Sequence, residues 1–486
     1  MRTTRRITAV RDRTARSSYD READPTMRTR ILPATVAASA LMILTGCDTP
    51  PNSANPGTAA PSVQGVWQMD GYGTAVAVSG HRLTMYDTTS VSCLPGNLAG
   101  DQQGGTGQNG SLRYLASAHR LITVTPQSSY SARLRIASNA GPRTLRRIPA
   151  LPDACSKKPS ADPRKVFDVF WQTYAENYPF FAAKHVDWQA VRDRYRPRIN
   201  KDTSDGELFA VLRKMIEPLH DAHTELSDGK DRAYSGERPG TPPHSEQDLA
   251  RIDRAVATAV GMPLRSYANG ALSFGRLPEG TGYLRITRFI SLTDEPSYVK
   301  WEAELDAALK AIPWERLRGL IVDVRANSGG ADPLGLRVLS RLTGQPYTAY
   351  TKFARNDPRD PALFTPGQPI TVRPYTGPRF TGPLAVLTGP LTISAGESFT
   401  QALMERAPAP IRIGQNTQGV FSDTMDRALP NGWRFILPNE EYRRADGTTF
   451  DGPGIPPQHR TPVFTEKELD QGRDSALAKA RELLHR

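Results

Sequence analysis

The sequence predicts an α/β core preceded by a small all-β domain. Residues 63–150 consist of short segments that alternate apolar and polar residues between Gly, Ser and Asn turns, which is typical of β-strands. From Gly282 onward, strand patterns alternate with helix patterns, which is typical of a layered α/β core. The chain has 486 residues, of which 38% are hydrophobic, and is therefore long enough for two or three domains with their own cores.

The all-β block contains six segments with the pattern of half-buried strands. Strands of this number and length make a small barrel or a small sandwich, and both remain open at this point. The Gly- and Gln-rich stretch 100–110 is expected to be a long loop. The block has no pattern of catalytic side chains, so we expect an accessory or binding domain. The six segments are 66–69, 74–78, 82–86, 112–115, 120–124 and 132–136.

A helical subdomain is expected over residues 160–262. At Asp162-Pro163 the spacing of apolar residues changes to the helical period, with aspartate as N-cap and proline in the first turn. Asp187 is expected to begin a second helix, and Ser204-Asp-Gly-Glu207 is a capping box that opens a third. A further helix is expected over 245–260.

Residues 270–486 are expected to form the α/β core. The predicted order is strand 283–287, helix 295–312, strand 320–324, helix 333–342, a Pro-rich excursion 356–380, an apolar strand from residue 383, helix 396–406 and strand 411–414. Residues 425–437 are predicted to fold as a hairpin about Asn431-Gly432, and the chain ends in a polar helix.

The N-terminal region has the layout of a signal peptide over residues 27–46. Two arginines precede a mostly apolar run that is too short to span a bilayer comfortably. The run ends in Leu-Thr-Gly-Cys47, which resembles the lipobox of bacterial lipoproteins, where the cysteine is lipidated and becomes the new N-terminus. An ordinary secretory signal with a chance cysteine is the alternative. Residues 1–26 are a possible start-site extension, and residues 47–62 are a linker.

These features predict an extracytoplasmic protein, anchored by lipid to the cell membrane of a bacterium through Cys47. In an oxidising environment the two remaining cysteines, Cys93 and Cys155, are able to pair. Two cysteines fix the connectivity but not the proximity, so this disulfide is a hypothesis.

The composition excludes several classes of function. The formal net charge is +12, to which nine Arg and four acidic residues within 1–30 contribute +5. The rest of the chain carries only a mild excess of positive charge, and no Lys or Arg run alternates with aromatic residues. We therefore expect no nucleic-acid partner. No Cys and His cluster has zinc spacing, so we expect no metal, and no cofactor is indicated. The sequence does not indicate an oligomeric state.

Ser394 is the first candidate for a chemical role. It follows an apolar strand through a tight turn and directly precedes helix 396–406. Backbone N–H groups at a helix N-terminus, such as that of Ala395, and the positive end of the helix dipole suit an oxyanion that grows on an acyl carbon. The alternative is that Ser394 merely caps the helix.

His223 is a candidate general base, because a hydroxyl nucleophile needs a base with a pKa near neutrality. His220 competes for this role from the same loop. The alternative is that His223 caps a helix or pairs with Asp221.

Two turns complete the set of candidates. Arg325-Ala-Asn-Ser-Gly-Gly330 ends a strand in glycines, where the Gly330 N–H is able to approach a substrate carbonyl closely, although a plain turn has the same pattern. Asp451 lies in a Gly/Pro-rich turn that is able to hold a carboxylate behind an imidazole, and a turn-forming Asp-Gly is the alternative.

Four motifs, in order, resemble a known family of serine peptidases. This family includes the C-terminal processing (tail-specific) proteases, the tricorn core protease and the retinoid-binding modules of photoreceptors. The resemblance covers the chain from about Asp162 to the C-terminus. The motifs are Leu219-His-Asp-Ala-His223-Thr224, Asp323-Val-Arg-Ala-Asn-Ser-Gly-Gly330, Ser394-Ala-Gly-Glu397 and Asp451-Gly-Pro-Gly-Ile-Pro-Pro457.

The resemblance implies a crotonase-like α/β spiral core and a serine peptidase site. The processing proteases use a lysine about two dozen residues after the serine, but residues 414–422 contain none. A Ser–Lys dyad is therefore not expected, and His223 takes the role of base, as in the tricorn-like branch. That branch has a serine where this chain has Ala222. We find no PDZ-like pattern between Thr224 and Gly282.

The sequence thus predicts a serine endopeptidase that acts on peptides or proteins, with Ser394 as nucleophile and His223 as base. Gly330 and Ala395 would form the oxyanion hole, and Glu397 would be structural. Asp451 would orient the histidine. The family has glutamate at this position, which is one methylene longer, so it is open whether Asp451 reaches the Nδ1 atom of His223. Asp423 is the alternative acid. The rivals are a catalytically weak member that binds a lipophilic or peptide ligand, and an interaction module centred on the β domain.

Overall fold

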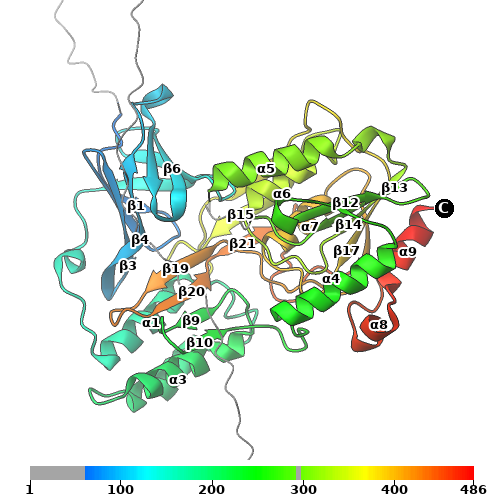
Figure 1. Ribbon diagram of the computed structural model, residues 1–486. Coiled ribbons are helices and arrows are strands. Elements are labelled where there is room, and N and C mark those ends of the chain that lie inside the picture. The colour runs from blue at the N-terminus through cyan, green and yellow to red at the C-terminus, as the bar shows by residue number, and fades with distance from the viewer. Residues whose placement is uncertain (1–60, 292–296, 486) are drawn as a thin grey trace, which may run out of the picture. The chain divides into compact units, whose positions relative to one another are not determined.

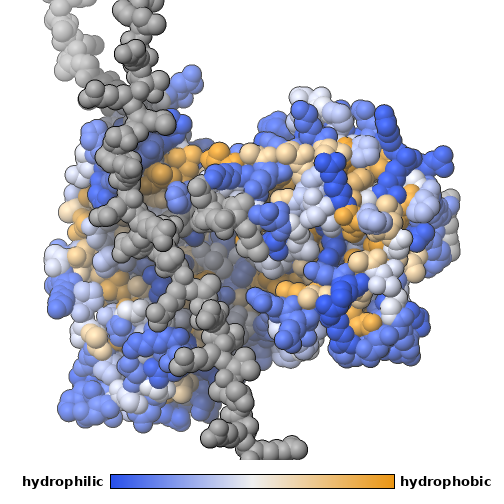
Figure 2. Space-filling view, in the orientation of Figure 1, coloured by the Kyte–Doolittle hydropathy of each residue, from blue (hydrophilic) through white to orange (hydrophobic). Residues whose placement is uncertain are grey.

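The computed structural model describes residues 61–291 and 297–485 (Figure 1). The predicted signal peptide, Cys47 and nearly all of the predicted linker lie outside these residues. Within the described part of the chain, no helix is long and apolar enough to cross a membrane. On the face shown in Figure 2, apolar residues lie in small groups among hydrophilic ones, as on most folded proteins.

The first domain is a closed antiparallel barrel of eight strands in sequence order. Strand β1 (Gly65–Met69) pairs with β2 and also with β8, which closes the barrel. The prediction of a small all-β domain is confirmed, and the barrel replaces the sandwich alternative. The other strands are β2 (Thr74–Ser79), β3 (Arg82–Thr89), β4 (Ser92–Gln102), β5 (Leu112–Ala116), β6 (Arg120–Pro126), β7 (Ser131–Ile136) and β8 (Arg143–Ile148).

The sequence pattern misses strands β4 and β8. Strand β4 contains Pro95-Gly96, which usually interrupts a strand, but its register against β3 shifts at this point and accommodates them. A Cβ at Gly96 would lie 2.9 Å from the carbonyl oxygen of Met85, so the strands approach closely there. Strand β8 carries three arginines, and only Leu145 is fully buried.

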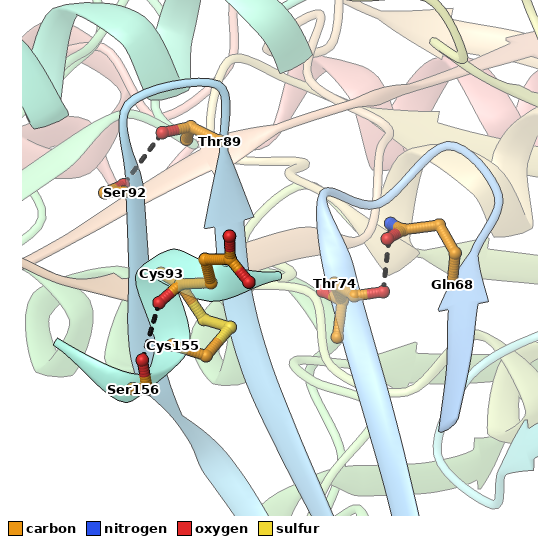
Figure 3. Close-up of a disulfide and its surroundings, with 8 residues drawn as sticks. Gln68, Thr74, Thr89, Ser92, Cys93, Cys155 and Ser156 are labelled. Carbon is orange, nitrogen blue, oxygen red and sulfur yellow. Dashed lines mark hydrogen bonds between the residues drawn. A yellow bond between two sulfur atoms is a disulfide. The ribbon is translucent and has the colours of Figure 1, made fainter. Parts of the chain in front are cut away.

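A disulfide joins Cys93 on β4 to Cys155 in a short 3₁₀ turn, Asp153–Ser156 (Figure 3). This turn lies between the last barrel strand and the first helix of the next subdomain. The bond therefore attaches the segment that leaves the barrel to the barrel wall.

Three helices follow, and each begins at its predicted cap. They are α1 (Pro163–Asn177), α2 (Trp188–Tyr195) and α3 (Asp205–Ile216), with the N-caps Asp162, Asp187 and Ser204. They share one continuous apolar core with the barrel and with a four-stranded sheet of order β10-β9-β20-β19. Its strands are β9 (Glu225–Ser227), β10 (Ala233–Ser235), β19 (Thr424–Ala428) and β20 (Arg434–Pro438), the last two being the predicted hairpin.

The α/β core is built on a seven-stranded sheet of order β11-β12-β13-β14-β17-β18-β22. The strands from β13 to β22 in this order are parallel. Their bounds are β11 (Arg265–Tyr267), β12 (Leu272–Arg276), β13 (Thr281–Ile286), β14 (Gly319–Asp323), β17 (Leu384–Thr388), β18 (Ile411–Gly414) and β22 (His459–Arg460). Strands β14 and β17 are buried along their whole length, as expected for a sheet covered on both faces.

Helices cover both faces of this sheet. On one face α5 (Tyr298–Ala311), α6 (Asp332–Ser340) and α7 (Ala395–Met404) pack in a common core, and on the other face lie α4 (Glu246–Val260) and α9 (Ser475–Leu484). The predicted α/β class is confirmed. Helix α4, which the sequence groups with the helical subdomain, packs instead against the sheet. A short helix, α8 (Glu466–Gln471), precedes α9.

A third sheet of order β16-β15-β21 lies beside this core. Its strands are β15 (Tyr347–Ala354), β16 (Gln368–Val372) and β21 (Glu440–Arg443), so the Pro-rich excursion 356–380 contains a strand that the sequence pattern misses.

The hairpin β19–β20 is attached to the barrel through a buried arginine. Arg427 donates to the carboxylate of Asp87 at 2.8 Å and to the carbonyl oxygen of Tyr72 at 2.6 Å. Arg427 and Asp87 are each only 8% exposed, so the two charges depend on each other for compensation.

We expect Arg427→Ala to lower the free energy of unfolding by about 3–5 kcal/mol, because Asp87 would remain buried without its partner. Urea denaturation measures this loss. Arg434→Ala is the matched control, since its pair with Asp426 on the same hairpin is 47% and 35% exposed and such pairs contribute about 0–1 kcal/mol. Equal losses in the two variants would contradict the assignment.

Candidate active site

Ser394 and Gly330 lie at the same edge of the core sheet. Strands β14 and β17 are adjacent and parallel, Gly330 follows the first, and Ser394 follows the second. In open α/β sheets, ligands bind at this carboxyl edge. The fold therefore brings together two segments that are more than sixty residues apart in the chain.

The backbone of Ser394 is strained. Its φ of 56° and ψ of −121° lie outside the regions that a serine usually adopts. It occupies the N-cap position of α7, yet its side chain makes no capping hydrogen bond. The structure thus removes the capping alternative, and the half-buried hydroxyl remains available for another role.

The amides of Gly330 and Ala395 both lie beside Ser394. Phe289 donates to the carbonyl oxygen of Gly329 and accepts from the amide of Ala331, so the Gly330 amide between them points away from this bridge. A Cβ at Gly329 would lie 2.7 Å from the Cβ of Ser394, which shows how closely the glycine turn approaches the serine. Among the described residues, no acceptor pairs with the Gly330 or Ala395 amide.

His223 is buried in a tight turn that Asp221 organises. The Asp221 carboxylate accepts from the His223 amide at 2.9 Å and from the Tyr178 hydroxyl at 2.8 Å. Desolvation lowers the pKa of His223, although the charges of Asp221 and Asp423 act in the opposite direction. The imidazole is therefore neutral at neutral pH, as a base must be. His220 is exposed and caps the preceding turn.

The Nδ1 atom of His223 is buried and has no hydrogen-bond partner in the described structure. Asp451 instead accepts from the Thr449 hydroxyl at 2.6 Å and from the Phe421 amide at 3.3 Å. Burial raises the pKa of Asp451 well above its usual range, although these two hydrogen bonds lower it. The role of Asp451 as the acid that orients His223 stays a prediction.

The fallback acid, Asp423, is engaged elsewhere. Its carboxylate accepts from the ammonium of Lys352 at 2.8 Å. Desolvation would raise the pKa of Asp423, but Lys352 and Arg143 outweigh it and hold the pKa below its usual value. Asp423 thus acts on His223 only through its charge, without a hydrogen bond.

Glu397 positions the nucleophile turn. Its fully buried carboxylate accepts from the amides of Gly419 and Val420 at 2.6 and 2.8 Å, and the carbonyl oxygen of Val420 accepts from the Ser394 amide at 3.0 Å. Burial raises the pKa of Glu397 to about 7, although its hydrogen bonds lower it. This agrees with the structural role expected from the sequence.

Other residues of the four motifs are also structural. Arg325 is 1% exposed and pairs with Asp323 at 2.6 Å and with Asp474, the N-cap of α9, at 2.7 Å. Asn327 donates to the carbonyl oxygen of Ile286 and accepts from the Gly329 amide, which fixes the glycine turn.

The sequence reasoning missed the part that Asp221 plays as a turn former. The available signal was its position two residues before His223, since aspartate side chains often accept from the amide two residues on.

Two cavities reach residues next to the serine or its glycine turn, although Ser394 itself lines neither. One, of about 340 Å³, reaches Ser328 and Ile393, and the other, of about 290 Å³, reaches Gly330 and Ala331. A substrate chain that passes Ser394 would therefore find space on both sides. Within the described ranges, no group of three or more His, Cys, Asp and Glu residues is placed to hold a metal ion.

We expect Gly330→Ala to reduce the rate at which Ser394 reacts with a fluorophosphonate by about 10²–10³-fold, the usual effect of losing one oxyanion donor. A Cβ there would lie 2.6 Å from the Phe289 backbone, at a φ of 129° that only glycine readily adopts. Gly335→Ala is the control, because its nearest neighbour would be at 3.5 Å. An unchanged rate in Gly330→Ala, measured on folded protein, would remove Gly330 from the oxyanion hole.

Two protein families match this chain. Residues 280–461 match the model of peptidase family S41, and residues 159–217 match the tricorn protease C1 domain. No curated protein sequence matches the chain.

Several solved structures are also similar to this chain. A putative peptidase from Parabacteroides merdae ATCC 43184 is 25% identical over 67% of this chain and 97% of its own, with a TM-score of 0.55. Mature CPAF complexed with lactacystin is 12% identical over 67% and 98%, with a TM-score of 0.47. The tricorn protease is 14% identical over 85% and 45%, with a TM-score of 0.41. Over residues 280–461 the chain therefore matches peptidase family S41, which is a family of serine-type peptidases.

Proposed function

We propose that this protein is an extracytoplasmic serine endopeptidase that hydrolyses peptide bonds through an acyl-enzyme on Ser394. One observation carries the proposal: Ser394 has a strained backbone and does not cap its helix, and it lies beside two amides that have no acceptor among residues 61–291 and 297–485. A nucleophile with two unpaired donors beside it is the arrangement that acyl transfer requires.

In the proposed reaction, the Ser394 hydroxyl attacks the scissile carbonyl carbon while His223 takes its proton. The amides of Gly330 and Ala395 stabilise the resulting oxyanion. His223 then gives the proton to the leaving amine, and the C–N bond breaks to leave the acyl-enzyme. Water, activated by His223, attacks this ester, and the acid product leaves with Ser394 restored.

Asp451 is proposed to stabilise the imidazolium form of His223. Burial and the charges of Glu397 and Asp221 raise the pKa of Asp451, and a positive charge on His223 nearby would lower it again. Its present partners, Thr449 and Phe421, leave the Nδ1 atom of His223 without an acceptor. Catalytic hydrogen bonds are often long or unformed without substrate. The unpartnered Nδ1 atom of His223 also favours a second candidate, a catalytically weak member that binds a lipophilic or peptide ligand.

Reaction with a fluorophosphonate probe separates the two candidates. We expect the wild type to be labelled and Ser394→Ala to lose labelling completely, since the nucleophile is gone. Ser328→Ala, which removes an exposed serine at the same edge of the sheet, is the control and should label like the wild type. A folded wild type that fails to label but binds an apolar dye would favour the binding protein.

The acid limb of the pH profile of kcat/KM should report the pKa of His223 in the free enzyme. The charge of Asp221 raises the pKa of this histidine, so Asp221→Asn, which keeps an oxygen to accept from the His223 amide, should move the limb to lower pH. Asp231→Asn removes an exposed charge from the same region and should leave the limb unchanged. A limb that moves to higher pH, or not at all, would rule out His223 as the titrating base.

The location is also a proposal. The disulfide between Cys93 and Cys155 supports an oxidising environment, and Cys47 is the proposed site of lipidation. Cys47→Ser should move the protein from the membrane fraction to the soluble fraction. Retention of this variant in the membrane fraction would show that the anchor lies elsewhere.

A further inference from the structure

The barrel lies outside both matched segments, yet it forms one wall of the cavity that reaches Gly330. Residues 119–121 and 137–139 of the barrel line this cavity of about 290 Å³. The opposite wall consists of core residues, among them Tyr298, Trp301 and Ala331. The cavity therefore exists only because the barrel and the core meet at this place.

The barrel wall is held in position by the core. Ala140, in the loop after β7, is 4% exposed and packs within the apolar core of the catalytic region. Lys352 donates to the carbonyl oxygen of Ala140 at 3.2 Å, and Gln368 donates to that of Pro142 at 2.8 Å. These contacts directly follow residues 137–139 in the chain and attach this part of the wall to the core.

The cavity lies within reach of a residue next to the scissile bond. Gly330 lines it and is also the proposed oxyanion donor. An extended peptide advances about 3.3 Å per residue. A substrate carbonyl at the Gly330 amide thus places a side chain one or two residues away at the mouth of this cavity.

The lining is mixed, and its aromatic side chains suit an apolar or aromatic group. Its polar members are His119, Arg120, Ser138, Asn139, Asp423 and Thr424. Tyr298, Trp301 and Leu121 are half-buried around it, and Ala331 is buried. The carboxylate of Asp423 also lines it but is already paired with Lys352, so it offers little to a cationic side chain. The volume lies just below the range of about 300–1,000 Å³ for small-molecule pockets, which suits one large side chain.

We propose that the barrel forms a substrate subsite with Tyr298 and Trp301, and that this subsite selects a large apolar or aromatic side chain next to the scissile bond. The inference rests on the proposed peptidase function and assigns a task to the barrel.

The test compares two matched variants of the barrel. Ser138→Phe puts a ring into the cavity wall, and Ser129→Phe puts the same ring on an exposed part of the barrel that does not line the cavity. A random peptide library is digested, and the cleavage sites are mapped by mass spectrometry. The wild type and Ser129→Phe should favour Phe, Tyr, Trp or Leu over Ala by at least about tenfold at one position.

In Ser138→Phe this preference should disappear or change to small residues. Trp301→Ala, which alters the opposite wall, should weaken the aromatic preference without abolishing labelling of Ser394. A preference for acidic side chains, which would point to the exposed rim residue Arg120, would overturn the proposal. An identical profile in Ser138→Phe and the wild type would do the same.

A second readout separates this inference from the peptidase function. Library peptides retained by the Ser394→Ala protein are identified with and without Ser138→Phe. Aromatic enrichment that Ser138→Phe removes, in a protein whose wild type neither labels nor cleaves, would support the subsite and refute the peptidase. Normal cleavage with no effect of Ser138→Phe in either readout would refute the subsite alone.

Discussion

The geometry of the site depends on one buried carboxylate, that of Glu397. It accepts from two consecutive amides, Gly419 and Val420, and the same Val420 accepts from the amide of Ser394. The nucleophile turn, the start of α7 and residues 419–423 therefore form one unit. Burying a carboxylate is costly without such donors, so these two hydrogen bonds stabilise both the buried Glu397 side chain and the loop that carries the two amides. The strained backbone of Ser394 persists because this unit surrounds it.

Residues 419–423 connect this unit to the barrel through hydrogen bonds. Phe421 donates to Asp451, and the Ser422 hydroxyl accepts from the amides of Asn439 and Glu440. Glu440 in turn accepts from the hydroxyl of Tyr72 in the barrel. The proposed acid and the barrel are thus connected to the nucleophile through one short segment. Hydrogen bonds of this segment therefore connect the barrel with the turn that holds Ser394.

The sequence predicts the parts of this structure that depend on local rules. The caps at Asp162, Asp187 and Ser204 satisfy the first amides of their own helices, so neighbouring residues suffice to find them. Ser394 is different, because a cap and a nucleophile both place a serine at a helix start, and only its φ of 56° separates them. The relation of Asp451 to His223 depends on loops far apart in the chain, which no local pattern encodes. Helix α4 is next to the helical subdomain in the sequence, but its apolar face packs on the core sheet, whose strands come later in the chain.

The closure of the barrel limits how it is able to recognise a polypeptide. Because β1 pairs with both β2 and β8, every strand has a neighbour on each side. Proteins that capture extended peptides commonly add them as a further strand to an open sheet edge, and main-chain bonding of that kind is largely indifferent to sequence. This barrel has no such edge to offer. Whatever it contributes to recognition must come from side chains, so it is suited to discriminate between polypeptides rather than to hold any unfolded chain.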